Sequence, residues 1–114
     1  MDRCRLAIII PAYNESATIA SVVHAVIAYG VPIVVDDGST DQTAFLARET
    51  GACVVSHENN AGYDAALNSG FVYAHTMGYD FVLTMDADGQ HNPRLLPAFI
   101  KTLDEGAEVV IGVR

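Results

Sequence analysis

The sequence contains little basic charge. Six lysine and arginine residues stand against fourteen aspartate and glutamate residues, which gives a formal net charge of −8 over 114 residues. A nucleic-acid-binding protein needs a basic face, and so does a segment that docks on an anionic membrane. The composition therefore argues against a nucleic-acid partner and against electrostatic docking of this segment on a membrane.

Long hydrophobic runs are also missing. No apolar stretch approaches the roughly 20 residues that a membrane-spanning helix needs. The apolar run 6–10 is too short for the core of a signal peptide, and the sequence P-A-Y-N-E follows it at 11–15 instead of a small-residue cleavage site. We therefore expect a cytoplasmic protein.

Several functional motifs are absent as well. The two cysteines, Cys4 and Cys53, have neither C-x-x-C nor zinc-site spacing, which is typical of reduced thiols near strands. No G-x-G-x-x-G or G-x-x-x-x-G-K-[ST] loop follows the first apolar run, so dinucleotide-binding and P-loop proteins lose their main support. A nucleotidyltransferase would also need a glycine- and lysine-rich phosphate loop there. A G-x-S-x-G elbow with a Ser-His-Asp arrangement is missing too.

What is present is a globular composition, 51% hydrophobic and 18% charged, in which apolar runs alternate with amphipathic segments. One domain is expected from this length. Strands are predicted at 6–10, 33–35, 52–56, 81–85 and 109–111, and helices at 19–27, from Ser39 or Thr40 to about Thr50, at 64–76 and at 93–103. This alternation predicts an α/β fold, with a mostly parallel sheet of about five strands and helices on both faces.

Three glycines mark particular positions in these helices. Gly30 is placed to end the first helix and Gly51 to close the second. Gly70 falls inside the third helix, where glycine costs about 1 kcal/mol relative to alanine. A close contact between helix and sheet, or a nearby ligand, would explain it.

Three polar clusters follow predicted strands. They occupy 11–15, 36–39 and 86–91. In parallel sheets, ligands bind beyond the carboxyl ends of the strands, near the point where the strand order reverses. We therefore expect the three clusters to gather along one edge of the sheet.

The cluster at 86–91 has two interpretations. Residues i and i+2 of an extended segment point the same way, so Asp86 and Asp88 can present two carboxylates to one Mg²⁺ or Mn²⁺ ion, with Gln90 or His91 within reach. The alternative is a polar loop with a D-G turn.

The other polar residues also leave alternatives open. Asp36 and Asp37 are either turn-forming residues or carboxylates that accept hydrogen bonds from a base or a ribose. Tyr13 either packs at the sheet edge or stacks on a flat base. His57 is a loop residue for which the sequence names no partner, and the remaining helical histidines are structural or surface residues.

Together these blocks resemble the inverting glycosyltransferases of the family-two type, which have the Rossmann-like GT-A fold. The resemblance covers P-A-Y-N-E at 11–15, V-V-D-D-G-S-T-D at 34–41, N-x-G-x-x-x-A-L-N-x-G at 60–70 and M-D-A-D-G-Q-H at 85–91. The closing Ile111–Arg114 is similar to the family's G-S-R segment, with Val113 at the serine position. The wording of 85–91 is closest to the dolichyl- and polyprenyl-phosphate sugar synthases.

The resemblance implies a donor site for a UDP- or GDP-sugar. The residues it implies for nucleotide-sugar binding are Pro11, Tyr13 and Glu15 in the nucleotide pocket, Val35 and Asp37 at the base and ribose, Asp86, Ala87 and Asp88 at the ribose and diphosphate, and Arg114 at the diphosphate. Asp86, Asp88 and Gln90 would hold Mg²⁺ or Mn²⁺.

The acceptor pocket and the catalytic base of such enzymes lie beyond the fifth strand, hence beyond Arg114. Residues 1–114 are therefore expected to be the donor part of a glycosyltransferase, whose acceptor is a lipid phosphate and whose full-length form works at the cytoplasmic face of a membrane. The alternative is a nucleotide-sugar-binding module that does not transfer the sugar. An exposed edge strand or apolar face would favour a homodimer.

Overall fold

A five-stranded sheet forms the centre of the computed structural model, which describes residues 6–85, 87 and 111–112. The strands are β1 Leu6–Ala12, β2 Val31–Asp36, β3 Cys53–Ser56, β4 Phe81–Thr84 and β5 Ile111–Gly112. Their order is β3-β2-β1-β4-β5, and every neighbouring pair is parallel. The predicted parallel sheet is confirmed.

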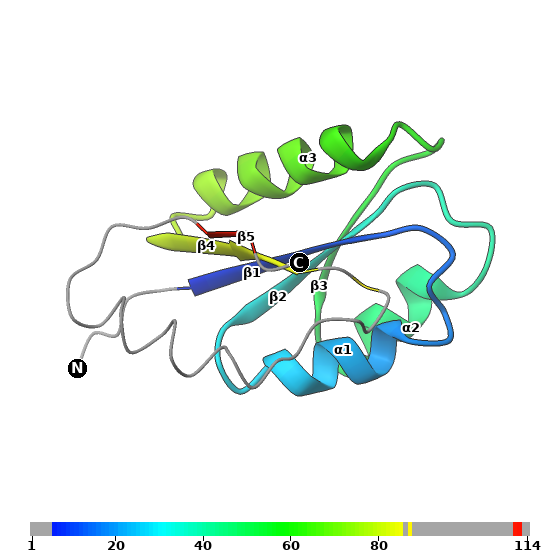
Figure 1. The fold of residues 1–114 in the computed structure, drawn as a ribbon, viewed down its shortest axis with the longest axis horizontal. Coiled ribbons are helices and arrows are strands. Elements are labelled where there is room, and N and C mark those ends of the chain that lie inside the picture. The colour runs from blue at the N-terminus through cyan, green and yellow to red at the C-terminus, as the bar shows by residue number, and fades with distance from the viewer. Residues whose placement is uncertain (1–5, 86, 88–110, 113–114) are drawn as a thin grey trace.

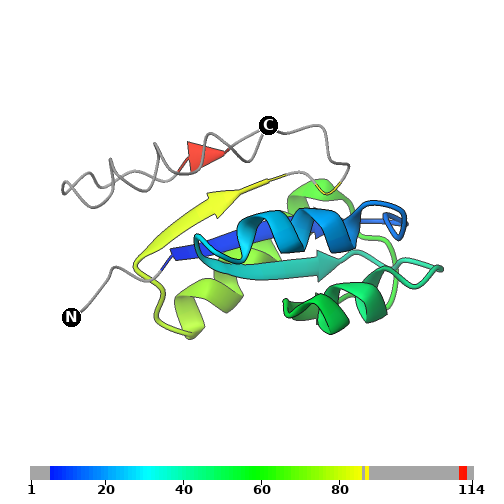
Figure 2. The ribbon, with the colours of Figure 1, turned by 90° about the horizontal axis from the view of Figure 1, so that it is seen from below.

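Helices cover both faces of this sheet, as predicted (Figure 1). The helices α1 Ile19–Val26 and α2 Thr43–Thr50 lie on one face, and α3 Tyr63–Thr76 lies on the other. A view from below shows α1 in front of β1 (Figure 2). The buried residues of α1 are Ile19, Val22, Val23 and Val26, which form the apolar face predicted from their spacing.

The central strand β1 explains how the two layers are held. Ile8, Ile9 and Ile10 are all fully buried. Side chains alternate between the faces of a strand, so Ile8 and Ile10 join the core on the α1 side, whereas Ile9 packs on the α3 side with Ala66. A continuous apolar run is therefore required in β1.

The interior glycine of α3 lies against this strand. A Cβ atom added to Gly70 would lie 2.5 Å from Cγ2 of Ile9, far below the usual carbon–carbon contact of about 3.5–4 Å. The predicted close contact between helix and sheet is confirmed.

The end of the first helix differs from the prediction. α1 ends at Val26, and Gly30 lies four residues further on. A Cβ at Gly30 would come within 2.9 Å of the carbonyl oxygen of Leu6, so the glycine allows close approach to β1 and does not cap the helix. Gly51 does close α2 as predicted, in a left-handed conformation with φ of 109°.

The start of the second helix also differs. α2 begins at Thr43, and neither Ser39 nor Thr40 caps it. The Ser39 hydroxyl accepts a hydrogen bond from the backbone N–H of Asn14 at 2.8 Å, and the N–H of Thr40 donates to Oδ1 of Asn14 at 2.8 Å. Both residues are therefore used to join two loops, and Asp41 accepts the N–H of Thr43 at the helix start.

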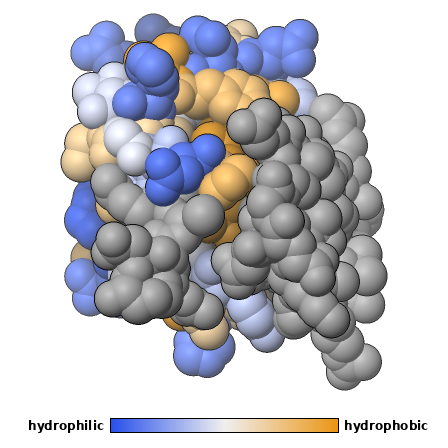
Figure 3. Space-filling view, turned by 90° about the vertical axis from the view of Figure 1, so that its left-hand side faces the viewer, coloured by the Kyte–Doolittle hydropathy of each residue, from blue (hydrophilic) through white to orange (hydrophobic). Residues whose placement is uncertain are grey.

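β1, β2 and β4 run from left to right in Figure 1, so their carboxyl ends lie towards the right of that view. The opposite end of the molecule shows polar side chains beside an apolar area (Figure 3). No helix among the described residues is long and apolar enough to cross a membrane. The predicted helix at 93–103 and residues 109–110 of the predicted fifth strand lie outside the described residues.

Candidate functional site

A cavity of about 410 Å³ lies at the carboxyl ends of β1, β2 and β4. Its size is within the range of small-molecule sites. The chain passes from β1 to β2 on one side and later adds β4 on the other, so the cavity lies where the strand order reverses. The residues that line it are Pro11, Ala12, Tyr13, Glu15, Asp37, Asn60, Gly62, Tyr63, Ala66 and Ala87.

Half of this wall was predicted. Among the residues named from the sequence, those that line the cavity are Pro11, Tyr13, Glu15, Asp37 and Ala87. Pro11 lies at the end of β1, and the others come from the segments that follow β1, β2 and β4. Residues of the first two polar clusters therefore gather at one edge of the sheet as expected, and Ala87, the one described residue of the third cluster, lies at the same edge.

The other predicted residues divide into two groups. Val35 does not line the cavity, because its side chain is fully buried beside Ile9 and Ala66 in the core on the α3 side. Asp86, Asp88, Gln90 and Arg114 lie outside the described residues. Ala87, the residue between Asp86 and Asp88 in sequence, is at the cavity wall.

Apart from Ala12 at the end of β1, the wall residues to which the sequence assigned no role come from the segment that leads into α3 and from the start of that helix. Asn60 and Gly62 precede the helix, and Tyr63 and Ala66 lie in its first turns. All four lie in the N-x-G-x-x-x-A-L-N-x-G block at 60–70, and all but Tyr63 occupy positions that the block specifies. Its glycine and alanine spacing was the signal that could have located this side of the cavity.

Asp37 is the buried carboxylate of the site, with 4% of its surface exposed. Oδ1 accepts a hydrogen bond from the N–H of Ala61 at 2.9 Å, and Oδ2 accepts one from the N–H of Gly62 at 2.9 Å. Burial by itself raises the pKa of Asp37, but the hydrogen bonds from Ala61, His57 and Gly62 outweigh it, so its pKa lies below the ordinary value. The carboxylate is therefore ionised near neutral pH.

His57, for which the sequence named no partner, bridges this carboxylate to α3. Its Nδ1 lies 2.7 Å from Oδ1 of Asp37, and its Nε2 lies 2.7 Å from Oγ of Ser69. An ionised carboxylate can only accept, so Nδ1 carries the hydrogen. The segments after β2 and β3 and the helix α3 are thereby joined through one imidazole ring.

Asp36 takes the other role considered for this acidic pair. Its Oδ1 accepts a hydrogen bond from the N–H of Ser39 at 3.1 Å, which stabilises the turn after β2. Asp36 is therefore the turn former, and Asp37 is the acid at the cavity.

The loop after β1 is fixed to the loop after β2 by hydrogen bonds. Asn14 has a left-handed backbone with φ of 53° and hydrogen-bonds with Ser39 and Thr40. The N–H of Glu15 donates to Oγ1 of Thr43 at 2.9 Å. Tyr13 and Glu15 are therefore presented by a loop with a defined conformation.

Ala87, which follows β4, is held by Thr18. Its hydroxyl donates to the carbonyl oxygen of Ala87 at 2.6 Å and lies 3.2 Å from Oε2 of Glu15. This contact joins residues 69 positions apart and holds Ala87 at the cavity.

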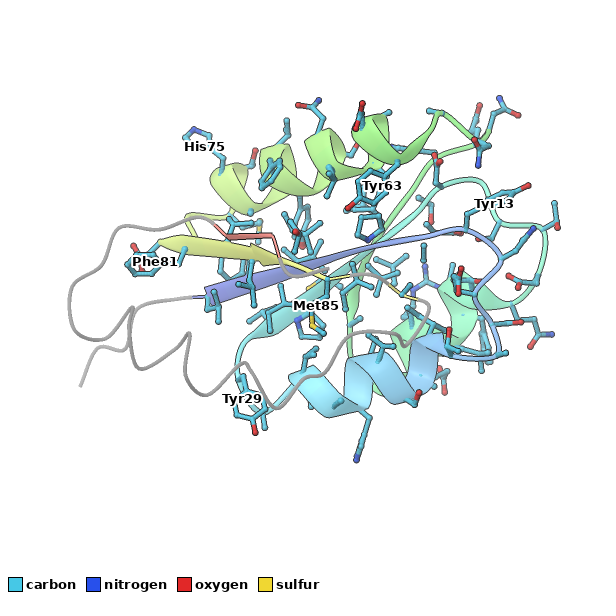
Figure 4. The ribbon with its side chains drawn as sticks, in the orientation of Figure 1. Tyr13, Tyr29, Tyr63, His75, Phe81 and Met85 are labelled. Carbon is cyan, nitrogen blue, oxygen red and sulfur yellow. The ribbon has the colours of Figure 1, made fainter. Side chains whose placement is uncertain are left out.

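Two tyrosines give the cavity aromatic surface. Tyr13 is 46% exposed and Tyr63 is 38% exposed, although both line the cavity. Figure 4 shows Tyr13 at the end of the molecule opposite His75 and Phe81, with Tyr63 between them in that view. The exposure of Tyr13 favours its interpretation as a stacking residue over packing at the sheet edge.

The described part of the cavity suits an uncharged or cationic group next to Asp37 and a planar ring next to Tyr13. No group of three His, Cys, Asp or Glu side chains able to hold a metal occurs among the described residues. The predicted metal ligands Asp86, Asp88 and Gln90 are not among those residues. The observation that bears on a metal is that Ala87, which stands between Asp86 and Asp88 in the sequence, lines the cavity together with Glu15.

Comparison with known proteins identifies the family. The model of glycosyl transferase family 2 matches residues 7–114. The chain belongs to glycosyl transferase family 2. It is 37% identical, over 96% of its length and 45% of the relative's, to polyprenol monophosphomannose synthase of Mycolicibacterium smegmatis. It is also 32% identical, over 94% of its length and 51% of the relative's, to UDP-N-acetylglucosamine–dolichyl-phosphate N-acetylglucosaminyltransferase of Methanococcus voltae.

Solved structures support the GT-A fold. Glucosyl-3-phosphoglycerate synthase of Mycobacterium tuberculosis, in complex with Mn²⁺, UDP and glucosyl-3-phosphoglycerate, matches with a TM-score of 0.71 and 30% identity, over 87% of this chain and 39% of that one. The same enzyme with Mg²⁺ and UDP matches with a TM-score of 0.68. This family-two chain spans about half the length of the curated relatives it matches.

Proposed function

We propose that residues 1–114 form the donor-binding part of a glycosyltransferase that transfers a sugar, with inversion, from a nucleoside-diphosphate sugar to an acceptor. The observation that carries the proposal is the cavity at the strand reversal, where Asp37, Tyr13 and Ala87 come together. Membership of the family supports it. The activity belongs to the whole protein, of which this chain is the donor part.

The nucleotide half of the donor would occupy the described wall. Tyr13 offers a ring for stacking on the base, and Asp37 accepts a hydrogen bond from the base or the ribose. Pro11 and Glu15 complete the pocket beside β1. Val35 keeps its proposed place at the base only through its backbone, since its side chain is buried.

The diphosphate would lie towards the segment after β4. Asp86, Ala87 and Asp88 contact the ribose and diphosphate in this proposal, Arg114 approaches the diphosphate, and Asp86, Asp88 and Gln90 hold Mg²⁺ or Mn²⁺. When bound, the metal supplies charge neutralisation for the departing nucleoside diphosphate. The Mn²⁺ and Mg²⁺ complexes of the M. tuberculosis synthase support this part.

The chain's own contribution is to bind and orient the donor. The hydroxyl of Thr18 and the joined loops hold the wall residues of the cavity in place. In this proposal the donor binds with its anomeric carbon exposed to attack from the face opposite the diphosphate. The acceptor oxygen then displaces the diphosphate with inversion, and no covalent sugar-enzyme step is needed. The base that takes the acceptor's proton is proposed to lie outside residues 1–114.

A polyprenyl phosphate is the proposed acceptor, at the cytoplasmic face of a membrane. The names of the polyprenol and dolichyl-phosphate relatives support it, although the M. tuberculosis synthase was crystallised with phosphoglyceric acid. A UDP- or GDP-sugar is the donor. The homodimer expected from the sequence stays a prediction, for which size-exclusion chromatography with light scattering is the measurement.

Calorimetric titration tests the donor site. UDP, GDP and their sugar conjugates are titrated into the chain with Mn²⁺ and then with EDTA. Metal-dependent binding of one nucleotide supports the proposal, and absence of binding by all of them contradicts it. Asp37→Ala should weaken binding with or without metal, and unchanged affinity would return Asp37 to the role of a loop residue.

An assay for sugar transfer separates an enzyme from a binding module. The full-length protein that contains this chain is incubated with the bound nucleotide sugar and a polyprenyl phosphate. Formation of a glycosylated lipid supports the transferase. Tight donor binding without any product would instead favour a module that binds nucleotide sugars and does not transfer them.

A further inference from the structure

Asp37 enters the cavity wall with most of its hydrogen-bonding capacity already used. A carboxylate offers about four acceptor positions, two on each oxygen. Oδ1 holds two donors, the imidazole Nδ1 of His57 at 2.7 Å and the N–H of Ala61 at 2.9 Å. Oδ2 holds one donor, the N–H of Gly62 at 2.9 Å. About one acceptor position therefore remains, and it belongs to Oδ2.

His57 is the side chain that fills Oδ1. Its ring is fixed at both nitrogens, because Nε2 lies 2.7 Å from the hydroxyl of Ser69 on α3. The side chain is 19% exposed, so protein surrounds most of the ring. A ring held from two sides keeps its N–H directed at Oδ1, which also accepts the N–H of Ala61, so that oxygen has no position left for a partner from the cavity.

We propose that His57, held by Ser69, is a positioning residue that restricts Asp37 to one free acceptor and so makes the cavity select uracil over guanine. This inference rests on the proposed function. The pairing edge of uracil has one N–H between two carbonyl groups. Guanine presents two neighbouring N–H donors, which pair best with two free carboxylate oxygens.

The chemistry of the mismatch gives the direction and size of the effect. Guanine could donate one hydrogen bond to Oδ2, but its second donor would face an Oδ1 that is already saturated. A buried donor left without a partner lowers affinity by roughly ten- to a hundredfold. Uracil leaves no donor unpaired, and the side-chain amide of Asn60 at the cavity wall can serve one of its carbonyl groups.

The test is the ratio of the dissociation constants of GDP and UDP, measured by calorimetry in the presence of Mn²⁺. The native chain should bind UDP at least about tenfold more tightly than GDP. His57→Ala opens one position on Oδ1, so the ratio should fall towards one. His57→Asn should keep most of the selectivity, since its amide N–H can replace the Nδ1 donor, and Ser69→Ala should lower the ratio by a smaller factor.

The ratio distinguishes selection from a merely structural role. A structural role would weaken both nucleotides equally and leave the ratio unchanged in His57→Ala. His75→Ala is the matched control, because His75 is exposed at the far end of α3 (Figure 4). Circular dichroism and thermal unfolding verify that each variant is folded.

Two results would overturn the inference and leave the donor site standing. They are equal affinity of the native chain for GDP and UDP, and an unchanged ratio in a folded His57→Ala variant. Binding of neither nucleotide by the native chain would overturn the proposed function and this inference with it.

Discussion

Replacing Gly70 by alanine tests how closely α3 must approach the sheet. In an unconstrained helix this change stabilises by about 1 kcal/mol, because alanine restricts the unfolded chain. Here the new methyl group would lie 2.5 Å from Cγ2, 3.1 Å from Cδ1 and 3.2 Å from Cγ1 of Ile9. Ile9 is fully buried in the central strand, so it has no open space into which to move.

The higher helix propensity of alanine stabilises the fold and the overlap of its methyl group with Ile9 destabilises it, and we expect the overlap to dominate. Overpacking of a buried site costs about 1–3 kcal/mol. An overlap of about 1 Å with a side chain fixed in β1 belongs at the upper end of that range. After subtraction of the helical gain, we expect Gly70→Ala to lower the free energy of unfolding by about 2 kcal/mol.

Urea unfolding followed by circular dichroism measures this change. Asn68→Ala is the matched control, since Asn68 is exposed on the same helix and should be slightly stabilised by its higher helix propensity. A Gly70→Ala variant as stable as the native chain, or more stable, would refute the close-contact argument. Because Tyr63 and Ala66 on α3 line the cavity, the variant should also bind nucleotide more weakly.

Three further predictions concern the loops. Thr18→Val removes the hydroxyl that donates to the carbonyl of Ala87, so metal-dependent nucleotide affinity should fall by roughly fivefold in calorimetry, with a smaller change in EDTA. Hydrogen bonds from Thr43, the side chain first, lower the pKa of Asp41 to about 2, despite an opposing effect of burial. A lowered carboxyl pKa stabilises the fold above the ordinary value of 3.8 and less as the pH falls towards 2, so Asp41→Asn should reduce the pH dependence of unfolding in that window. Asp88→Ala should abolish metal-dependent binding and leave the circular dichroism spectrum unchanged, and equal binding in Mn²⁺ would contradict the metal assignment.

The sheet could be predicted because its strands depend on a repeating signal. Residues 8–10 are apolar on both faces, and this requirement of a doubly covered strand is visible without any knowledge of neighbours. Helix boundaries depend on single hydrogen bonds, so they are harder to predict from the sequence. Serine is a common helix-capping residue, yet the hydroxyl of Ser39 accepts a hydrogen bond from the N–H of Asn14, a residue 25 positions away. Glycine commonly ends helices, yet Gly30 is required here because the backbone of Leu6 lies too close for a side chain.

The residues of the cavity also differ in how well the sequence predicts their roles. Tyr13, Glu15 and Asp37 follow strands directly, so the topology of a parallel sheet was enough to bring them together. His57 follows β3, but its role depends on Asp37 and Ser69, which come from two other segments. Nothing in the local sequence indicates that convergence. Val35 was assigned to the nucleotide by resemblance, whereas its alternation with Asp36 along β2 points its side chain into the core on the α3 side.

The contacts of Asp37 link the conformation of the loop before α3 to nucleotide binding in the cavity. The carboxylate accepts hydrogen bonds from Ala61 and Gly62, which directly precede α3, and the same carboxylate lines the cavity. Asp37→Ala would leave these two part-buried N–H groups and His57 without their acceptor, which destabilises the loop before α3. Loss of binding in that variant therefore combines a missing ligand contact with a displaced loop. Substitution of His57 leaves the N–H groups of Ala61 and Gly62 paired with Asp37, so it disturbs the loop less. It therefore tests how Asp37 recognises the nucleotide separately from how Asp37 orders the loop.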